Sequence, residues 1–357
     1  MRFPEFSREW EYHELQSIAP NISSGKDKPN NEGTVVLYGS TGIMGHTTTE
    51  SYNSEIVIVA RVGANAGQLQ LVDIPCGVTD NALVVDAKSW NKYVFFYLQH
   101  FNLNKLVFGS GQPLITGGML KKIKIWTGNN VERNKIVHLL SLMEERIDTQ
   151  RKIIEKYESL IRGISNKLLY EFEGASVRLG DILIERSDRT QINNQHEVLS
   201  STVKGIFSQR EYFSKDIASE NNVGYKIIRL HDVVLSPQNL WMGNINYNDK
   251  FDIGIVSPSY KIFSIAEGYD KRFVSALLKT HRALYNYMQV SEQGASVVRR
   301  NLNIEAFEQL TFKIPPYTKQ CEIGRVLDSM QNRLDLAIST QNCLEQQKQW
   351  LLRNLFI

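Results

Sequence analysis

Apolar side chains recur at alternating intervals of four and three residues from Ile136 to Leu168. No proline interrupts this stretch, and its one glycine is Gly163. Positions spaced in this way stay on one side of a helix, so the pattern is typical of a long helix that lies along a partner helix. We therefore predict a helix over residues 131–173, about 60 Å long at 1.5 Å per residue.

The same stripe returns 187 residues later, from Ile323 to Leu355, at the C-terminal end of the chain. The correspondence extends upstream, where Ile123-Lys-Ile-Trp126 aligns with Leu310-Thr-Phe-Lys313. An internal repeat of this length outranks any single short motif as evidence for architecture. Two unrelated helices that share a common heptad would be the alternative explanation.

We expect the two helices to pair with each other through a pairing stripe. Its residues are Ile136, Leu140, Met143, Ile147, Ile154, Ile161, Leu168, Ile323, Leu327, Met330, Leu334, Leu344 and Leu351. Gln150 and Gln341 are polar positions within the same pattern, and polar residues inside such a stripe can set helix register.

The segments between the helices predict two mixed α+β domains, because short apolar runs alternate with glycine-rich turns. The second half begins with Leu179-Gly-Asp-Ile182, which resembles Leu15-Gln-Ser-Ile18 in the first half. The predicted order is a first globular domain at 1–130, a central long helix at 131–173, a second globular domain at 174–317 and a C-terminal long helix at 318–357. Among the individual elements we predict that Glu9–Leu15 begins a short helix, that Val256–Phe263 is a strand and that Phe273–Met288 is a helix.

Composition excludes some classes of protein. The 357 residues carry a net charge of +3, and no segment is a basic tail. No run of 18 apolar residues predicts a membrane span, and the N-terminus lacks the apolar core of a signal peptide. The three cysteines, Cys76, Cys321 and Cys343, form neither a zinc pattern nor a disulfide framework, which fits a cytoplasmic protein.

The sequence offers no catalytic constellation. Gly39–Gly45 lacks the Gly-Lys-Ser/Thr ending of a phosphate-binding loop, and a tight turn between strands explains it better. Pro315-Pro-Tyr317 resembles the target-amine loop of amino-methyltransferases, but Ile314 stands where that loop needs a hydrogen-bonding side chain. The histidines show no metal-binding spacing. We therefore predict no catalytic residue, no metal site and no cofactor in this chain.

Five features together resemble the specificity subunits of type I restriction-modification enzymes. They are Arg2-Phe-Pro-Glu-Phe6, Tyr38-Gly-Ser-Thr-Gly42, Gly109-Ser-Gly-Gln-Pro113, Ile314-Pro-Pro316 and the paired long helices. The resemblance covers essentially the whole chain. It implies two target recognition domains that each recognise one half of a bipartite duplex DNA sequence, held apart by antiparallel coiled-coil helices. It also implies a non-catalytic subunit to which two modification subunits, which use S-adenosylmethionine, and restriction subunits bind.

Under this interpretation, polar and aromatic loop residues contact DNA, because these residue types bind base edges and phosphates. The candidates are Tyr38, Ser40, Thr41, Arg61, Asn65, Ser110, Gln112 and Lys121 in the first domain, and Gln238, Asn239, Trp241, Ser296, Arg299 and Arg300 in the second. Each could instead be a solvated loop residue; Trp241 could be packed, and Arg61 could pair with a carboxylate. A two-fold repeat scaffold that binds proteins rather than DNA is the alternative function.

Overall fold

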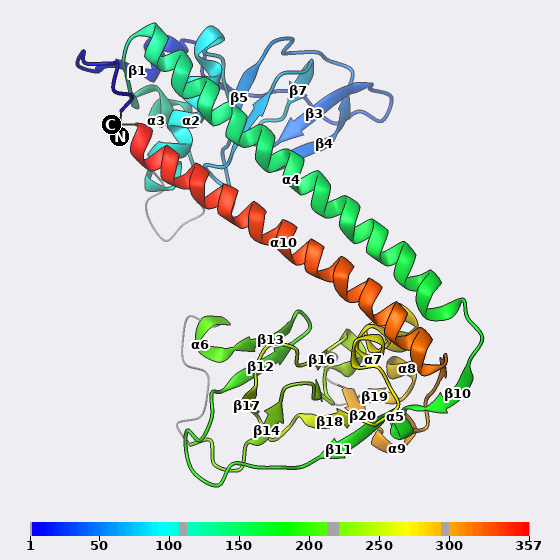
Figure 1. The fold of residues 1–357 in the computed structure, drawn as a ribbon. Helices are drawn as coiled ribbons and strands as arrows, with labels where there is room; N and C mark the ends of the chain where they lie inside the picture. Colours follow the sequence, from blue (N-terminus) through cyan, green and yellow to red (C-terminus); the bar gives the residue numbers. More distant parts are fainter. Residues whose placement is uncertain (1, 107–112, 213–220, 294–299, 357) are drawn as a thin grey trace. The chain divides into compact units, whose positions relative to one another are not determined.

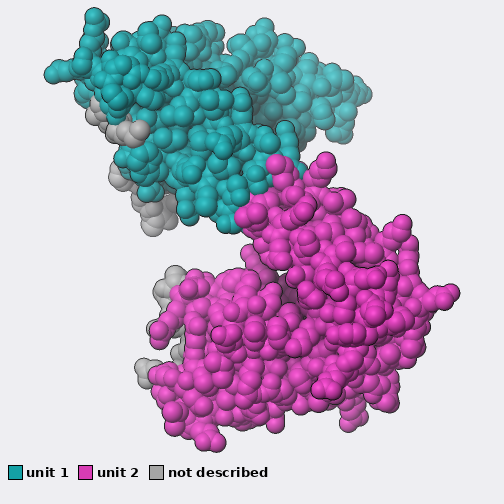
Figure 2. Space-filling model, viewed as in Figure 1, with its two compact units in different colours: residues 1–152, 338–357 teal, residues 153–337 magenta. Residues whose placement is uncertain are grey.

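The computed structural model describes residues 2–106, 113–212, 221–293 and 300–356, and Figure 1 shows the fold. The chain divides into two compact units, coloured separately in Figure 2. Unit 1 contains residues 1–152 and 338–357, and unit 2 contains residues 153–337. The long helices are therefore not separate domains, because each contributes one part to each unit.

Unit 1 is built from strands and short helices that precede the first long helix. Its elements are β1 (Glu11–Glu14), α1 (Leu15–Ile18), β2 (Ser23–Ser24), β3 (Val35–Gly39), β4 (Gly42–Thr47), β5 (Ile56–Ala60), β6 (Leu69–Val72), β7 (Cys76–Val78), β8 (Ala82–Val85), η1 (Lys88–Trp90), α2 (Asn91–Phe101), η2 (Leu103–Leu106), α3 (Gly117–Lys121), β9 (Lys124–Thr127) and the first part of α4 (Asn130–Tyr170). The sheets have the strand orders β2-β8-β5-β6, β4-β3-β7 and β1-β9.

Strand β5 is apolar throughout because both of its faces are covered. Val57 and Val59 lie in the core that contains α2, whereas Ile56 and Ile58 lie in a smaller core with Cys76. Successive side chains of a strand point to opposite faces, so a strand between two cores has no polar face. Burial also raises the pKa of the Cys76 thiol to about 11, which makes it a packing residue rather than a reactive one.

Unit 2 repeats the general plan with different loops. Its elements are the remainder of α4, β10 (Ala175–Arg178), α5 (Leu179–Ile182), β11 (Leu183–Arg186), β12 (Leu199–Thr202), β13 (Gly205–Ser208), α6 (Gln209–Tyr212), β14 (Lys226–Arg229), β15 (Val233–Leu235), η3 (Leu240–Met242), β16 (Ile245–Tyr247), β17 (Ile253–Val256), β18 (Lys261–Ile265), α7 (Lys271–Leu278), α8 (His281–Gln289), β19 (Ser291–Gln293), β20 (Arg300–Leu302), α9 (Ile304–Glu308), β21 (Thr311–Ile314) and the first part of α10 (Tyr317–Leu355). The main sheet has the order β11-β18-β15-β16.

The internal repeat is visible in matching elements of the two units. Strand β1 pairs antiparallel with β9 in unit 1, and β10 pairs in the same way with β21 in unit 2. The backbone N–H of Leu15 donates to the Ile123 carbonyl at 2.8 Å, and the N–H of Leu179 donates to the Leu310 carbonyl at 2.7 Å. The positions aligned from sequence thus occupy the same places in each unit.

Three predicted elements are wrong. Residues Glu11–Glu14 form β1 rather than the start of a helix, because they pair with β9, and the short helix α1 begins only at Leu15. The strand predicted from Val256 to Phe263 is two strands, β17 and β18, separated by a turn in which the Tyr260 N–H donates to the Ser257 carbonyl at 3.1 Å. The helix predicted from Phe273 to Met288 is also two elements, since the Thr280 side chain caps a new helix, α8.

The long helices pack against each other within each unit. In unit 1, Met143 and Ile147 of α4 share a cluster with Leu344 of α10, and Lys348 Nζ lies 2.6 Å from Glu144 Oε1. Leu140 of α4 shares a core with Leu352 of α10, whereas Ile147, further along α4, clusters with the earlier residue Leu344. The two helices therefore run antiparallel. In unit 2, Leu168 and Leu169 of α4 belong to the same core as Ile323 and Leu327 of α10.

The pairing stripe lies on the packed side of both helices. Its buried members are Ile136, Leu140, Met143, Ile147, Ile323, Leu327, Leu334 and Leu344. The half-buried members are Ile154, Ile161, Leu168, Met330 and Leu351. Gln341 donates a 2.9 Å hydrogen bond to Glu345 on its own helix, so this contact does not link the two helices.

The start of α4 is attached to the N-terminal segment by a buried carboxylate. Glu132 accepts hydrogen bonds from Arg2 Nε and Nη2, both at 2.7 Å, and from Trp10 Nε1 at 3.2 Å. Asn129 caps the helix by accepting from the Glu132 N–H at 2.9 Å. Within the described residues, no helix combines the length and apolarity that crossing a bilayer requires.

Replacing Leu140 with alanine should lower the free energy of unfolding by about 2–5 kcal/mol, because it removes a fully buried side chain and leaves a cavity. Urea unfolding followed by circular dichroism would measure the change. Leu142→Ala is the matched control on the same helix, since Leu142 is 42% exposed; we expect a change within about 0.5 kcal/mol. Equal effects at the two positions would contradict the packing assigned to α4.

Candidate nucleic-acid interface

In unit 1, three loops meet around the backbone carbonyl of Asn81. Ser40 and Thr41 form the two-residue turn between β3 and β4, in agreement with the tight turn predicted for Gly39–Gly45. Ser40 Oγ donates to the Asn81 carbonyl at 2.6 Å, and the Arg61 N–H donates to the same oxygen at 3.0 Å. The turn is held further by Gln70, whose Nε2 donates to the Gly39 carbonyl at 2.9 Å.

Arg61 is the most distinctive side chain of this group. Its Nε is buried and has no hydrogen-bond partner, and none of the ion pairs between described residues includes it. A buried donor without a partner is uncommon in native proteins and calls for an explanation. The carbonyl of Arg61 accepts from the Ile115 N–H at 2.8 Å, which brings the segment after residue 112 to the same place.

The other candidates of the first domain are placed differently. Asn65 is an exposed residue of the Gly63–Gly67 turn. Tyr38 packs against the small core that contains Cys76, and burial, together with the nearby Cys76 and Asp73, raises the pKa of its hydroxyl. Lys121 ends α3, which packs against α1. Ser110, Gln112, Ser296 and Arg299 lie outside the described residues.

In unit 2, the structure brings three candidates together from two distant segments. The Arg300 guanidinium lies 4.8 Å from the centre of the Trp241 ring, and the Arg300 N–H donates to the Gln238 carbonyl at 3.2 Å. A guanidinium over an indole ring is a favourable cation–π pair. The Asn239 carbonyl caps the adjacent turn by accepting from the N–H groups of Met242 and Asn244. Trp241 is therefore both packed, as the alternative interpretation held, and part of the candidate surface.

The Trp241 indole has a further property. Its Nε1 is buried without a hydrogen-bond partner, as is Arg61 Nε in unit 1. Each unit thus has a buried polar nitrogen without a hydrogen-bond partner in a residue next to loop side chains of the types that contact DNA. The combination of a flat aromatic ring and a guanidinium suits contacts with bases or phosphates.

Several residues at these sites were missed by reasoning from sequence. Gln70 lies on β6 between Leu69 and Leu71, which pack against the core. Because successive side chains of a strand point to opposite faces, this alternation indicates that Gln70 points away from the core. Asn81 contributes only its backbone carbonyl, which every residue has, so its side-chain type gave no indication of this role. Lys279 of unit 2 lies between α7 and α8, at the break in a segment that the sequence predicts as one continuous helix.

The Ile314-Pro-Pro segment has a structural role. Ile314 is 5% exposed at the end of β21, and Pro316 directly precedes α10. The Pro316 carbonyl accepts from the N–H groups of Lys319 and Gln320, and Gln320 Nε2 donates to the Pro315 carbonyl at 2.9 Å. The prolines thus form the rigid start of a helix, where they suit the local geometry. In the parts of the chain that the structure describes, no three His, Cys, Asp or Glu side chains group in a way that could hold a metal ion.

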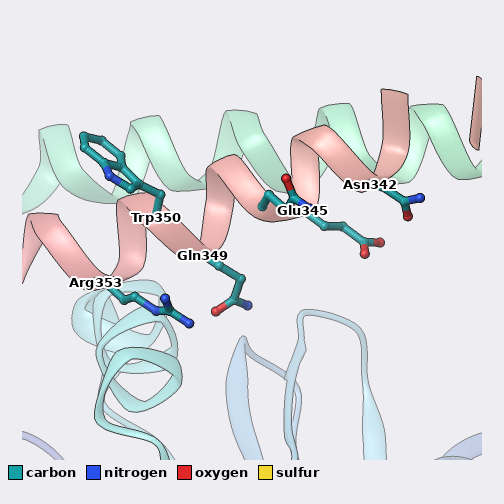
Figure 3. A pocket seen from close by; sticks show the side chains of 6 residues that line it. Asn342, Glu345, Gln349, Trp350 and Arg353 are labelled. Atoms are coloured by element: carbon teal, nitrogen blue, oxygen red, sulfur yellow. The ribbon is translucent and has the colours of Figure 1, made fainter. Parts of the chain in front are cut away.

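A polar surface also follows the C-terminal part of α10 in unit 1 (Figure 3). It consists of Asn342, Glu345, Gln346, Gln349, Trp350 and Arg353. In Figure 3, Glu345, Gln349 and Arg353 project to one side of the helix and Trp350 to the other. Trp350 is 52% exposed and is the one aromatic residue among these polar side chains.

Comparisons with known proteins agree with this architecture. Residues 7–159 match the family model of the type I restriction modification DNA specificity domain. The chain is 24% identical over 131 residues to the specificity subunit of the type I restriction enzyme EcoprrI of Escherichia coli. That match spans 36% of this chain and about a third of the relative's length.

Solved structures extend the likeness to the whole chain. The S subunit of a type I restriction-modification system from M. genitalium is similar over 100% of this chain and 99% of its own, with a TM-score of 0.67 and 15% identity. A chain from a study of complex assembly and conformational transition of the type I R-M system is similar over 98% and 97%, with a TM-score of 0.52 and 13% identity. The predicted resemblance to specificity subunits is thereby confirmed: residues 7–159 match the model of the type I restriction modification DNA specificity domain, and the whole chain has the fold of the S subunits that it resembles.

Proposed function

We propose that this chain is the DNA-recognition subunit of a type I restriction-modification system. Each globular domain recognises one half of a bipartite duplex sequence. The repeat carries this proposal: the same scaffold occurs twice, while the loops placed on it differ. Around Asn81 the first domain presents Ser40 and Arg61, whereas the second presents Trp241 and Arg300. A repeated scaffold with divergent contact residues is what recognition of two different half-sites requires.

In this proposal the chemistry belongs to partners. Two modification subunits methylate adenine with S-adenosylmethionine, and restriction subunits cleave. The buried Ile314 supports this division, since it offers no hydrogen-bonding side chain to a target amine. The exposed α10 surface around Trp350 is suited to binding a partner subunit, because exposed aromatic residues are enriched in protein interfaces.

The alternative function is a repeat scaffold that binds only proteins. The same α10 surface would serve it, so surface composition does not separate the two. Salt dependence does: DNA binding through phosphate contacts weakens steeply as salt rises, because counterions are released on binding. Binding to a protein alone, unaffected by salt and without affinity for duplexes, would favour the scaffold.

Mapping adenine methylation in a host that expresses the chain with its modification subunit tests the proposed function directly. We expect one asymmetric bipartite motif with a fixed gap, lost when this chain is deleted. The reason is that the sequence preference resides here and not in the methyltransferase. Methylation that is unchanged by the deletion would refute the proposal.

Arg61 and Arg300, one in each domain, offer a reciprocal test of half-site recognition. Arg61→Ala should relax base preference in one half of the motif, and Arg300→Ala in the other, each at a cost of about 1–3 kcal/mol. Fluorescence anisotropy with duplexes mutated in one half at a time would measure both effects. Each variant is the control for the other, and Arg178→Ala, which removes only an exposed ion pair with Asp181, should leave both halves unchanged. Loss of preference in the same half by both variants would contradict the assignment.

The long helices should set the length of the unread gap. Inserting one heptad into both α4 and α10 adds about 10 Å to each helix while keeping the pairing stripe in phase. We expect the preferred gap of the methylated motif to lengthen. A five-residue insertion in both helices is the control, since it rotates the stripe by about 140° and should disrupt the pairing. An unchanged gap in the folded heptad variant would exclude a measuring role for the helices.

A further inference from the structure

Unit 2 contains a cleft between its part of the helix pair and its globular domain. The cleft has a volume of about 570 Å³. The helices contribute residues such as Arg162 of α4 and Asp328 of α10, and the globular domain contributes the β12–β13 turn, the end of β16 and one side of α7. All of these residues lie within unit 2. We call this feature the unit 2 cleft.

The globular wall of the unit 2 cleft is basic. It carries Lys204, Lys250, Arg272 and Lys279, with His281 beside them and Asp249 as its acidic member. Arg272 lies 3.7 Å from Asp270. None of the ion pairs between described residues includes Lys204, Lys250 or Lys279, although the carboxylates of Asp249, Asp328 and Asp335 also line the cleft.

Lys279 is held in a defined position by neutral oxygens. Its Nζ donates to Asn246 Oδ1 at 2.7 Å, to the Gly243 carbonyl at 3.2 Å and to the Val203 carbonyl at 3.5 Å. Asn246 is 4% exposed and is oriented by its own donation to Ser201 Oγ at 2.7 Å. These contacts position the ammonium without neutralising it.

The surroundings of Lys279 disfavour the charged form of its side chain. Desolvation lowers the pKa of its ammonium to about 8, although the residue as a whole keeps exposed surface along the cleft. An anion that entered the cleft would offset this cost, because it would supply the opposite charge that the neutral oxygens do not.

The helical wall carries the guanidinium of Arg162 and the carboxylates of Asp328 and Asp335, so it is acidic on balance. Asp335 accepts a hydrogen bond from Gln331 at 2.9 Å, and Asp328 accepts from Asn332 at 3.5 Å, both within α10. A purely structural explanation would be attraction between this acidic wall and the basic wall opposite. That explanation predicts a loss of stability when Lys279 is replaced, without any effect specific to a ligand.

We propose that the basic wall of the unit 2 cleft binds a phosphodiester backbone, with Lys279 as its anchored cation and Lys204 at its rim. The proposal rests on the proposed DNA-recognition function and adds a phosphate contact outside the Trp241–Arg300 group. Such a contact fixes the position of the duplex and carries no base preference. It would let the second domain bind DNA irrespective of the half-site sequence.

The test is the salt dependence of duplex affinity for the full chain with its modification subunit. Lys279→Met should lower the slope of log Kd against log salt by about one, equally for matched and mismatched duplexes. Lys204→Met should also lower this slope. Because Lys204 is exposed in a turn, its replacement should not disturb folding, so the result remains interpretable if Lys279→Met misfolds. Lys313→Met is the matched control, since Lys313 is an exposed lysine on β21 that does not line the cleft.

The outcomes separate this inference from the proposed function. Wild-type complex with no salt-dependent duplex affinity would overturn both. Specific binding whose slope is unchanged in the Lys279 and Lys204 variants would overturn the cleft contact alone, as would a lowered melting temperature with an unchanged slope. The difference between wild type and Lys279→Met should also shrink as the pH rises above about 8, because Lys279 then loses its proton in the wild type.

Discussion

Burial of the pairing stripe is the constraint on which both units depend. Leu140 of α4 and Leu352 of α10 lie in the same core as α2 of the first globular domain, and Ile323 and Leu327 lie in the core of the second. Each helix therefore completes a core in addition to pairing with its neighbour. Disrupting the stripe would expose apolar surface in the helix pair and in a globular domain at once. The helix pairing and the globular domain therefore stabilise each other.

The repeat separates what supports a site from what forms it. The Leu15–Ile123 and Leu179–Leu310 backbone hydrogen bonds occupy equivalent places, because main-chain pairing tolerates many side chains. The loops carried by this scaffold have no such restriction, and they diverge in length and residue type. A scaffold that is held by backbone contacts and a shared stripe leaves its loops free to acquire different contacts with DNA.

Buried polar groups mark the places where function and stability compete. Glu132 is fully satisfied by Arg2, Trp10 and its own helix cap, and it joins the N-terminal segment to α4. Arg61 Nε and Trp241 Nε1 are buried without partners, and Lys279 has partners but no opposite charge among the described ion pairs. An unsatisfied donor costs free energy unless a ligand supplies the missing acceptor. Glu132 thus stabilises the fold through satisfied hydrogen bonds, whereas Arg61 and Trp241 each bury a polar atom at a cost in stability.

The long helices, the internal repeat and the α+β class could be predicted from sequence, because heptad spacing and strand-length apolar runs are local patterns that survive in any context. The predicted turn at Ser40 rested on equally local chemistry. The breaks at Ser257–Tyr260 and Thr280 were missed because apolar runs on both sides outweighed a short turn and a cap. The Trp241–Arg300 contact and the Lys279 site join residues far apart in sequence, and no pattern along the chain specifies which distant side chains will meet. Those arrangements arise from packing, which folds the chain so that the meeting side chains bury surface together.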